Sequence, residues 1–362
     1  MKHRINNFFE SVSLKEHEGY FVSNESNVTY MSGFTGEASY LILSSKGQVL
    51  MTDGRYDAQA QMECEHFEVT KWHNPTRPDP ETIIFYLKKY EIKTLYFNEN
   101  SLAYKHYRVL YNALKHHEMN VELVPISGLI EALREVKEAS EIECIKIACD
   151  IADKALESLV PHIKIGVTEL QLVAQLEYYL KSYGADNISF DTIILSGDKT
   201  AMPHGKPSDK KLEKGDFLQV DFGALYKGYH SDMSRTFIIG EASEKQIALY
   251  DMLLKATVDS TAVLQGGIKA AVPDAKVREI LDDEATEYYY PGLGHGVGLD
   301  IHEGPSMSIT SKDDIRTNNV VTIEPGVYIA GWGGMRIEDT IVVTEDGYEV
   351  LTKYPRALQV LG

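Results

Sequence analysis

The first third of the chain alternates short apolar runs with segments of helical periodicity. Residues 39–44, 48–53 and 94–98 have the length and composition of buried strands. Residues 81–90 and 103–117 instead repeat apolar positions every three or four residues, as amphipathic helices do. This alternation predicts a domain of mixed α/β type.

A different pattern begins near residues 125–135. Residues 131–160 carry apolar positions at helical spacing, which predicts one long amphipathic helix that breaks near Pro161. Further helices are expected at about 168–182 and 243–265, and they are followed by strand-like segments. A length of 362 residues exceeds that of one typical domain. The predicted domains comprise residues 1–126 and 127–362.

Two aspartates interrupt the strand pattern of LQVDFGALYKGYHSDMSRTF, residues 218–237. Apolar and polar residues alternate on both sides of a central turn, which predicts a hairpin. A fold about the midpoint of Tyr226 and Lys227 places Asp221 directly opposite Asp232, with Cβ atoms about 5 Å apart. Two bare carboxylates at that distance repel by roughly 3 kcal/mol at an effective dielectric constant of about 20. Either water screens them on a solvated face, or a cation lies between them.

A second pair of acids repeats this arrangement in VVTIEPGVYIAGWGGMRIEDTIVV, residues 320–343. A hairpin folded about Gly331 brings Glu324 opposite Glu338. Hard and borderline divalent cations bind carboxylate oxygens. Two hairpins with opposed carboxylates in apolar strands therefore favour cation binding over screening by water.

A nitrogen donor is available in GLGHGVGLDIHEGP, residues 292–305. His295 lies among glycines, whose missing side chains allow backbone and ligand to approach closely. His302 follows seven residues later. If this segment is extended, the two histidines are up to about 23 Å apart, so they serve one site only if the loop curls back. A hydrogen-bonded structural role is the alternative for a lone histidine.

Taken together, these segments resemble the proline peptidases of the pita-bread metallopeptidase family, which includes Xaa-Pro aminopeptidases and Xaa-Pro dipeptidases. The resemblance covers nearly the whole length and rests on motifs in a specific order. They are MSGFTGEASYLIL, VLMTDGRYDAQA, SGDKTAMPHGKPSD, LQVDFGALYKGYHSDMSRTF, GLGHGVGLDIHE, VVTIEPGVYI and GGMRIEDT. The resemblance implies an α/β (α+β) chain. A creatinase/prolidase-type N-terminal domain would precede a pita-bread catalytic domain, in which helices back a curved antiparallel sheet.

The resemblance also implies two divalent metal ions. Their ligands would be Asp221, Asp232, His295, Glu324 and Glu338. In the family, the positions of Asp232 and Glu338 bridge both ions, that of Asp221 completes one, and those of His295 and Glu324 complete the other. Carboxylate-rich ligation and the family's habit favour Mn²⁺, with Co²⁺ or Zn²⁺ able to substitute. Four carboxylates would balance the charge of two divalent ions.

The implied reaction is hydrolysis of Xaa-Pro bonds at the N-terminus of peptides or in dipeptides. Metal binding lowers the pKa of water, which supplies a nucleophile at neutral pH. By resemblance, Glu324 takes the proton of the attacking water, while His302 and His204 contact the substrate and the tetrahedral intermediate. Arg336 is implied as a residue that orients Glu338. A surface ion pair is the alternative role for this arginine.

The chain departs from the family pattern at Pro291, where proline peptidases usually carry a histidine. Proline has neither a donor nor a titratable group, so the substrate end of the site is affected. A milder departure is Lys199, where related sequences often have Arg or Asn. Two alternatives follow: a hydrolase of the same fold that acts on non-prolyl peptides or another amide, and a binding protein with little turnover. Five intact ligands argue against the second alternative.

Composition narrows the setting in which such an enzyme would work. A formal charge of −18 and a pI near 5.1 argue against nucleic-acid binding, which requires a basic patch. No apolar run reaches the length of a membrane span, and the first residues lack the apolar core of a secretory signal. The three cysteines form no metal or redox motif. We expect a cytoplasmic enzyme that acts on small peptides, and the resemblance suggests a homodimer.

Overall fold

The computed structural model describes residues 2–72 and 80–362, and the chain divides into two compact units, Met1–Arg134 and Glu135–Gly362. The first unit is built on a six-stranded sheet in the order β4-β3-β2-β1-β5-β6. Its strands are β1 (Glu18–Val22), β2 (Ser39–Ser44), β3 (Gly47–Asp53), β4 (Glu68–Trp72), β5 (Thr94–Phe97) and β6 (Glu122–Pro125). Its helices are α1 (Lys2–Val12), α2 (Glu25–Ser32), α3 (Asp57–Glu63), α4 (Pro80–Lys89), α5 (Tyr104–His116) and α6 (Leu129–Glu135).

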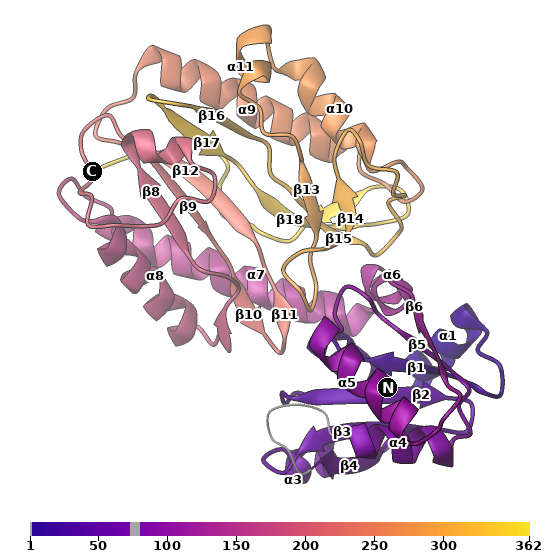
Figure 1. The fold of residues 1–362 in the computed structure, drawn as a ribbon. Helices are drawn as coiled ribbons and strands as arrows, with labels where there is room; N and C mark the ends of the chain where they lie inside the picture. The colour runs from indigo at the N-terminus through magenta and orange to yellow at the C-terminus, as the bar shows by residue number, and fades with distance from the viewer. Residues whose placement is uncertain (1, 73–79) are drawn as a thin grey trace. The chain divides into compact units, whose positions relative to one another are not determined.

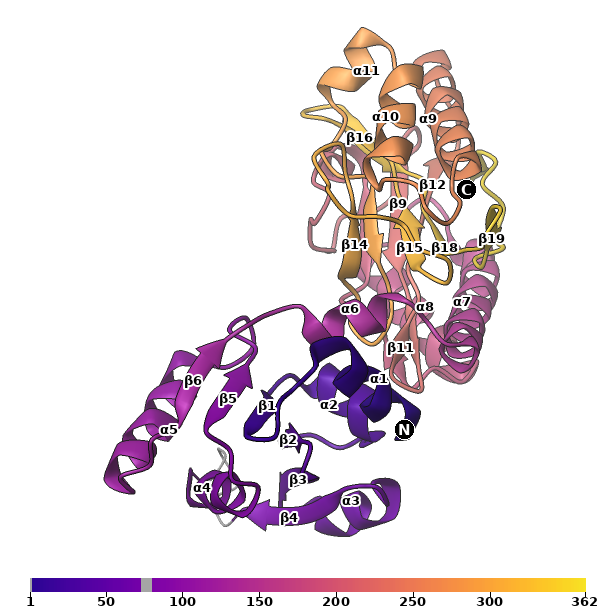
Figure 2. The same ribbon diagram turned by 90° about the vertical axis from the view of Figure 1, so that its right-hand side faces the viewer.

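Helices cover both faces of this sheet, which explains why its strands are apolar runs. Phe21 and Ile42 pack with Leu87 of α4 and Leu110 of α5 on one face. Tyr20 points to the other face and meets Phe8 of α1, with ring centroids 5.5 Å apart. Figure 2 shows α1 and α2 on one side of the strands and α5 on the other. The predicted mixed α/β domain is therefore confirmed.

The second unit contains antiparallel sheets backed by helices. Its helices are α7 (Ala139–Leu159), the 3₁₀ turn η1 (Val160–His162), α8 (Glu169–Ser182), the 3₁₀ turn η2 (Gly197–Ala201), α9 (Glu244–Ala262), α10 (Ala271–Ile280) and α11 (Asp283–Glu287). One sheet has the order β20-β12-β9-β8, with β8 (Ile193–Ser196), β9 (Phe217–Phe222), β12 (Met233–Ile239) and β20 (Val360–Leu361). Another has the order β14-β13-β15-β18-β19, with β13 (Gly294–Gly296), β14 (Glu303–Met307), β15 (Val320–Ile323), β18 (Asp339–Val343) and β19 (Tyr348–Val350).

Two shorter ladders complete this unit. They are β7 (Asn187–Ile188) with β10 (Ala224–Tyr226) and β11 (Tyr229–His230), and β16 (Gly326–Ile329) with β17 (Gly333–Arg336). Two cores lie beneath the helices. One joins α7 and α8 to β8, β9 and β12, and the other joins α9 and α10 to β15, β17 and β18. Figure 1 shows the strands of this unit lying between α7 and α8 on one side and α9 and α10 on the other.

The single long helix expected over residues 131–160 is wrong. The structure has α6 and α7 instead, separated by residues 136–138. Glu138 caps α7 in a capping box with Glu141, which starts a new helix at that point. The Lys137 amide donates to the Asn318 carbonyl oxygen at 3.0 Å, outside any helix. Apolar spacing continued across the break and concealed it, because a capped helix start leaves no gap in the periodicity.

Candidate active site

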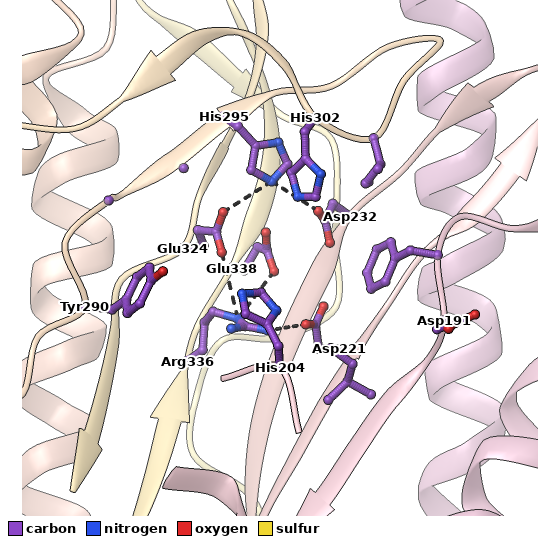
Figure 3. A pocket seen from close by; sticks show the side chains of 15 residues that line it. Asp191, His204, Asp221, Asp232, Tyr290, His295, His302, Glu324, Arg336 and Glu338 are labelled. Carbon is purple, nitrogen blue, oxygen red and sulfur yellow. Dashed lines mark hydrogen bonds and ion pairs between the residues drawn. The ribbon is translucent and has the colours of Figure 1, made fainter. Parts of the chain in front are cut away.

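All eight predicted metal-ligand and catalytic residues line one pocket of about 450 Å³ in the second unit. They are His204, Asp221, Asp232, His295, His302, Glu324, Arg336 and Glu338. Figure 3 shows their side chains converging from several strands and loops. The other lining residues are Phe190, Asp191, Ile193, Tyr290, Gly292, Gly294 and Ile301, none of which was predicted as a site residue.

The predicted register of the first hairpin is wrong by two residues. Asp221 on β9 lies opposite Ser234, not opposite Asp232. The turn is centred between Lys227 and Gly228, which both have positive φ, at 50° and 81°. Such a two-residue turn matches the twist of the flanking strands, and it moves the fold point by one residue. Asp221 and Asp232 are each only 5% exposed, so the solvated hairpin face is excluded as well.

The predicted register of the second hairpin is confirmed. Ile323 pairs with Asp339 and Gly326 pairs with Arg336, so Glu324 and Glu338 occupy matching positions between the two ladders. Hydroxyl groups hold both carboxylates. Ser234 Oγ donates to Glu338 Oε2 at 2.6 Å, and Thr322 Oγ1 donates to Glu324 Oε1 at 3.1 Å. These hydroxyls fix the directions in which the two carboxylates point.

The glycine-rich loop curls back, so both histidines reach the same pocket. The ring centroids of His295 and His302 are 4.4 Å apart. His295 Nδ1 donates to the Gly296 carbonyl oxygen at 3.0 Å, which leaves Nε2 as the atom facing the acids. Nε2 lies 3.3 Å from Glu324 Oε1 and 3.6 Å from Asp232 Oδ2.

A buried ion pair anchors the chain beside His302. Lys137 Nζ lies 3.1 Å from Glu303 Oε2, and the two side chains are 1% and 6% exposed. Glu303 also accepts the Asp300 amide at 3.0 Å. This pair fixes the end of the loop from which His302 enters the pocket.

Arg336 is buried at the floor of the pocket and is not a surface residue. Its Nη2 donates to Asp221 Oδ2, its Nε to Ser234 Oγ at 2.8 Å, and its Nη1 to Tyr328 Oη at 2.8 Å. Glu338 Oε2 lies 3.8 Å from Arg336 Nε. The strongest contact of the guanidinium is therefore with Asp221, and it reaches Glu338 mainly through the shared Ser234.

The electrostatics of the four acids are unfavourable without a cation. Burial, followed by the neighbouring Glu338, raises the pKa of Asp232 well above its usual range. Burial and then Glu324 do the same for the pKa of Glu338. Burial is also the main cause that raises the pKa of Asp221 and of Glu324. Burial lowers the pKa of His295, which favours the neutral imidazole that binds metals.

Two oxygen atoms show that the site fits a metal ion. Asp232 Oδ1 and Glu338 Oε1 are buried and have no hydrogen-bond partner among the described residues. Buried carboxylate oxygens are normally hydrogen bonded or bound to metal. Donor atoms of Asp232, His295 and Glu338 all lie within 4.8 Å of one another, a spacing that one cation can span. Buried carboxylates and an imidazole that converge in a pocket with further histidines are typical of metal-dependent hydrolases.

Comparison with known proteins identifies the family. Residues 143–345 match the model of metallopeptidase family M24, and residues 4–136 match that of the creatinase/prolidase N-terminal domain. The chain belongs to metallopeptidase family M24, the pita-bread proline peptidases, and combines the creatinase/prolidase N-terminal domain with the catalytic domain of that family.

Individual relatives cover nearly the whole chain. An uncharacterized peptidase of Bacillus subtilis is 35% identical over 99% of this chain and 99% of its own length. The structure of an Xaa-Pro dipeptidase from Bacillus anthracis is 36% identical, with a TM-score of 0.94 over 99% of both chains. That of an X-Pro aminopeptidase from Thermotoga maritima is 33% identical, with a TM-score of 0.88 over 97% of this chain and 100% of that one.

Several residues that shape the site were not foreseen. Ser234, Thr322 and Tyr328 orient predicted site residues, yet each lies in an ordinary strand pattern. Their partners are set by pairing between strands that are far apart in the sequence. A search for hydroxyl side chains two residues from each predicted acid would have found Thr322 and Ser234.

Proposed function

We propose that this metallopeptidase hydrolyses Xaa-Pro bonds, and that Asp221, Asp232, His295, Glu324 and Glu338 hold two divalent ions. The observation that carries the proposed metal site is that Asp232 and Glu338 each have a buried oxygen with no hydrogen-bond partner within residues 2–72 and 80–362, and that donor atoms of both residues lie within 4.8 Å of one from His295. Relatives described as Xaa-Pro dipeptidase and X-Pro aminopeptidase support the substrate class. Their two names differ in the preferred length of the substrate, so both dipeptides and longer peptides belong in the tests.

Each residue of the pocket has a part in the proposed reaction. When bound, the metal ions lower the pKa of water and polarise the scissile carbonyl group. Glu324 accepts the proton of the attacking water, as a partly buried carboxylate with a raised pKa is suited to do. His302 and His204 contact the substrate and stabilise charge that develops on the tetrahedral intermediate. Arg336 holds Asp221 and, through Ser234, keeps Glu338 aligned.

Mn²⁺ is the proposed native ion, because four of the five proposed ligands are carboxylates, and Co²⁺ or Zn²⁺ are expected to substitute. The direct test strips the protein with a chelator and then assays Ala-Pro, Ala-Pro-Ala and Ala-Ala with each ion. We expect metal-dependent cleavage of at least one Xaa-Pro peptide and little cleavage of Ala-Ala. Equal cleavage of Ala-Ala would contradict the proline preference without contradicting the metal site.

A second candidate function, peptide hydrolysis with relaxed selectivity, is favoured by Pro291. This residue is exposed and does not line the pocket, whereas Tyr290 beside it does. A charge-assisted hydrogen bond to substrate contributes about 1.5–3 kcal/mol, which corresponds to roughly tenfold to hundredfold in efficiency. We predict that Pro291→His raises kcat/KM on Xaa-Pro peptides by a factor in this range and leaves Xaa-Ala cleavage unchanged.

The assay compares wild type and Pro291→His on Xaa-Pro and Xaa-Ala peptides, with and without Mn²⁺. Full activity of the wild type on Xaa-Pro peptides, unimproved by the added imidazole, would mean that another donor such as Tyr290 or His204 replaces it. In that case the first candidate function stands without the second.

The assembly and the location of the enzyme are also part of the proposal. We propose a homodimer in the cytoplasm, from the resemblance to the family and from the composition. None of the helices within residues 2–72 and 80–362 combines the length and the apolar character that crossing a membrane requires. Sedimentation that detects only monomer at micromolar concentration would overturn the dimer and nothing else.

A further inference from the structure

One carboxylate outside the pocket is fully buried and fully hydrogen bonded. Glu169 is the first residue of α8, and its side chain is 0% exposed. Its Oε1 accepts the Ser196 amide at 2.7 Å and the Ser196 hydroxyl at 3.0 Å. Its Oε2 accepts the Ser208 amide at 2.8 Å, the Ser208 hydroxyl at 2.9 Å and the Lys199 ammonium group. A buried carboxylate that accepts two amides, two hydroxyls and an ammonium group is held in one position.

The partners of Glu169 are the two ends of one loop. Ser196 is the last residue of β8, and Ser208 lies on the far side of residues 197–207. Lys199, inside this loop, also donates to the Lys206 carbonyl oxygen at 3.2 Å and to Ser208 Oγ at 2.8 Å. A single side chain therefore closes the base of the loop, which we call the His204 loop (residues 197–207).

His204 lies within this loop and lines the active-site pocket. Its neighbours Met202 and Gly205 take part in tight turns, with Met202 N donating to Lys199 O at 3.0 Å and Gly205 N to Met202 O at 3.0 Å. The base of the loop is in turn joined to α8, since the Leu170 amide donates to Ser208 O at 3.2 Å. Because His204 is exposed, its position depends on the backbone of the loop more than on packing of its own side chain.

We infer that Glu169 is a positioning residue for catalysis, which places the imidazole of His204 over the reacting groups by closing the His204 loop. The inference rests on the proposed contact of His204 with the substrate and the intermediate. Glu169 itself touches neither, because it does not line the pocket. Loss of this closure should displace His204, and small displacements of a catalytic group reduce rates by up to about a hundredfold.

The test uses Glu169→Gln in the full-length enzyme loaded with Mn²⁺. Glutamine has the same length, but its NH₂ group cannot accept hydrogen bonds, so one end of the loop loses its acceptor. Glu244→Gln is a matched control. Glu244 is likewise the first residue of a helix, α9, and it lies within the Ser243/Gln246 capping box as Glu169 lies within the Thr168/Gln171 capping box. Glu244 is exposed, so the control variant loses a charge at a helix start but does not affect the His204 loop.

A double-mutant cycle with His204→Ala is the main measurement, on Ala-Pro or whichever peptide the wild type cleaves. Glu169→Gln should lower kcat by about 10- to 100-fold with little change in KM, while Glu244→Gln keeps wild-type kcat. In the His204→Ala background, Glu169→Gln should have almost no further effect, because the group that it positions is gone. Additive losses would overturn the inference, since Glu169 would then act independently of His204.

Hydrogen exchange supplies a measurement that does not depend on activity. Amides of residues 196–208 should exchange faster in Glu169→Gln than in Glu244→Gln, with metal content close to that of the wild type. Unchanged exchange in this segment would overturn the inference even if the rate fell. If Glu169→Gln does not fold, Lys199→Met replaces it in the double-mutant cycle with His204→Ala. This substitution removes the ammonium donor and leaves the Glu169 carboxylate in place. If His204→Ala alone does not change kcat, the proposed role of His204 is wrong, and so is the catalytic part of the inference. The hydrogen-exchange rates of residues 196–208 still test whether Glu169 closes the loop.

Discussion

Glu338 and Asp339 are adjacent in the sequence and each is only 1% exposed, yet they lie in opposite electrostatic surroundings. Asp339 is the first residue of β18 and Glu338 directly precedes it. Successive residues of an extended chain point to opposite faces, so the two carboxylates face different partners. Asp339 accepts hydrogen bonds from Arg235 Nη2 at 2.8 Å and from Thr352 Oγ1 at 2.6 Å, and it pairs with Arg356 as well. Glu338 faces three other acids, and among the described lining residues only Arg336 carries a guanidinium.

The pKa values follow this difference. Although burial opposes ionisation of Asp339, the guanidinium groups of Arg235 and Arg356 hold its pKa below the usual value. Burial and Glu324 raise the pKa of Glu338. On the face of Asp339, arginines of the chain therefore supply the positive counter-charge. On the face of Glu338, most of the counter-charge has to come from outside the chain. The first face is structural, and the second is the face at which we propose that a cation binds.

Removal of a bridging acid should produce the largest effect. We predict that Asp232→Ala loses both metal ions and all measurable hydrolysis while the protein remains folded, because a proposed shared ligand is gone. Elemental analysis and circular dichroism measure the two outcomes. Asp251→Ala, on the exposed side of α9, should keep both metal and activity. Unchanged metal content in Asp232→Ala would contradict the ligand assignment.

The opposite face should respond through stability and not through chemistry. Asp339→Asn leaves the buried Arg235 without its charge partner, and breaking a buried ion pair costs about 3–5 kcal/mol. We expect urea denaturation to show a loss of this size in both metal-free and metal-loaded protein. Asp232→Asn in the metal-free protein should cause no comparable loss. If the two variants are destabilised equally in the absence of metal, the distinction between the faces is wrong.

The third and smallest effect concerns pH. In the metal-free protein the raised pKa of Asp232 and of Glu338 means that the folded state binds more protons than the unfolded chain, from the ordinary carboxyl range upward. Stability then falls as pH rises through that window, by at most about 1.4 kcal/mol per pH unit for each group. Asp339, whose pKa is lowered, contributes stability above its usual range and loses it as pH falls.

Comparison of wild type with Asp232→Asn isolates this effect. In chelator, between about pH 5 and pH 8, the variant should become progressively more stable than wild type as pH rises. Added Mn²⁺ should reverse the order, because the wild type then gains binding energy that the variant lacks. A difference between the two proteins that does not change with pH would show that the acids are compensated within the chain.

Sequence alone predicted elements well where local patterns decide them. The strand over residues 39–44 and the start of α8 after Thr168 follow from apolar runs and a capping residue. The register of the hairpin around Gly331 was also predictable, because a glycine cluster fixes its turn. The register of the hairpin that contains Asp221 was not predictable, because Lys227 adopts a positive φ, which is not expected for a lysine. The break between α6 and α7 was not predicted, because apolar periodicity gives no sign of a helix cap.

The pocket could be predicted as a set of residues but not as an arrangement. The acids and His295 stand out because such residues are unusual in apolar strands and glycine-rich loops. The approach of His302 to His295 and the contact of Arg336 with Asp221 depend on how distant strands meet. Glu169 gives no signal at all in the sequence, since an acid at a helix start is common. Its role becomes visible only when the three-dimensional partners are known.

The proposed metal ligands come from both large sheets of the second unit, and this affects the order in which the protein folds. Asp221 lies on β9 of one sheet and His295 on β13 of the other. The hydrogen bond between Ser234 and Glu338 joins the two sheets, and these residues are 104 positions apart in the sequence. A partly folded chain with only one sheet in place cannot complete the site. Metal should therefore bind after the rate-limiting step, so that Mn²⁺ slows unfolding and leaves the refolding rate nearly unchanged.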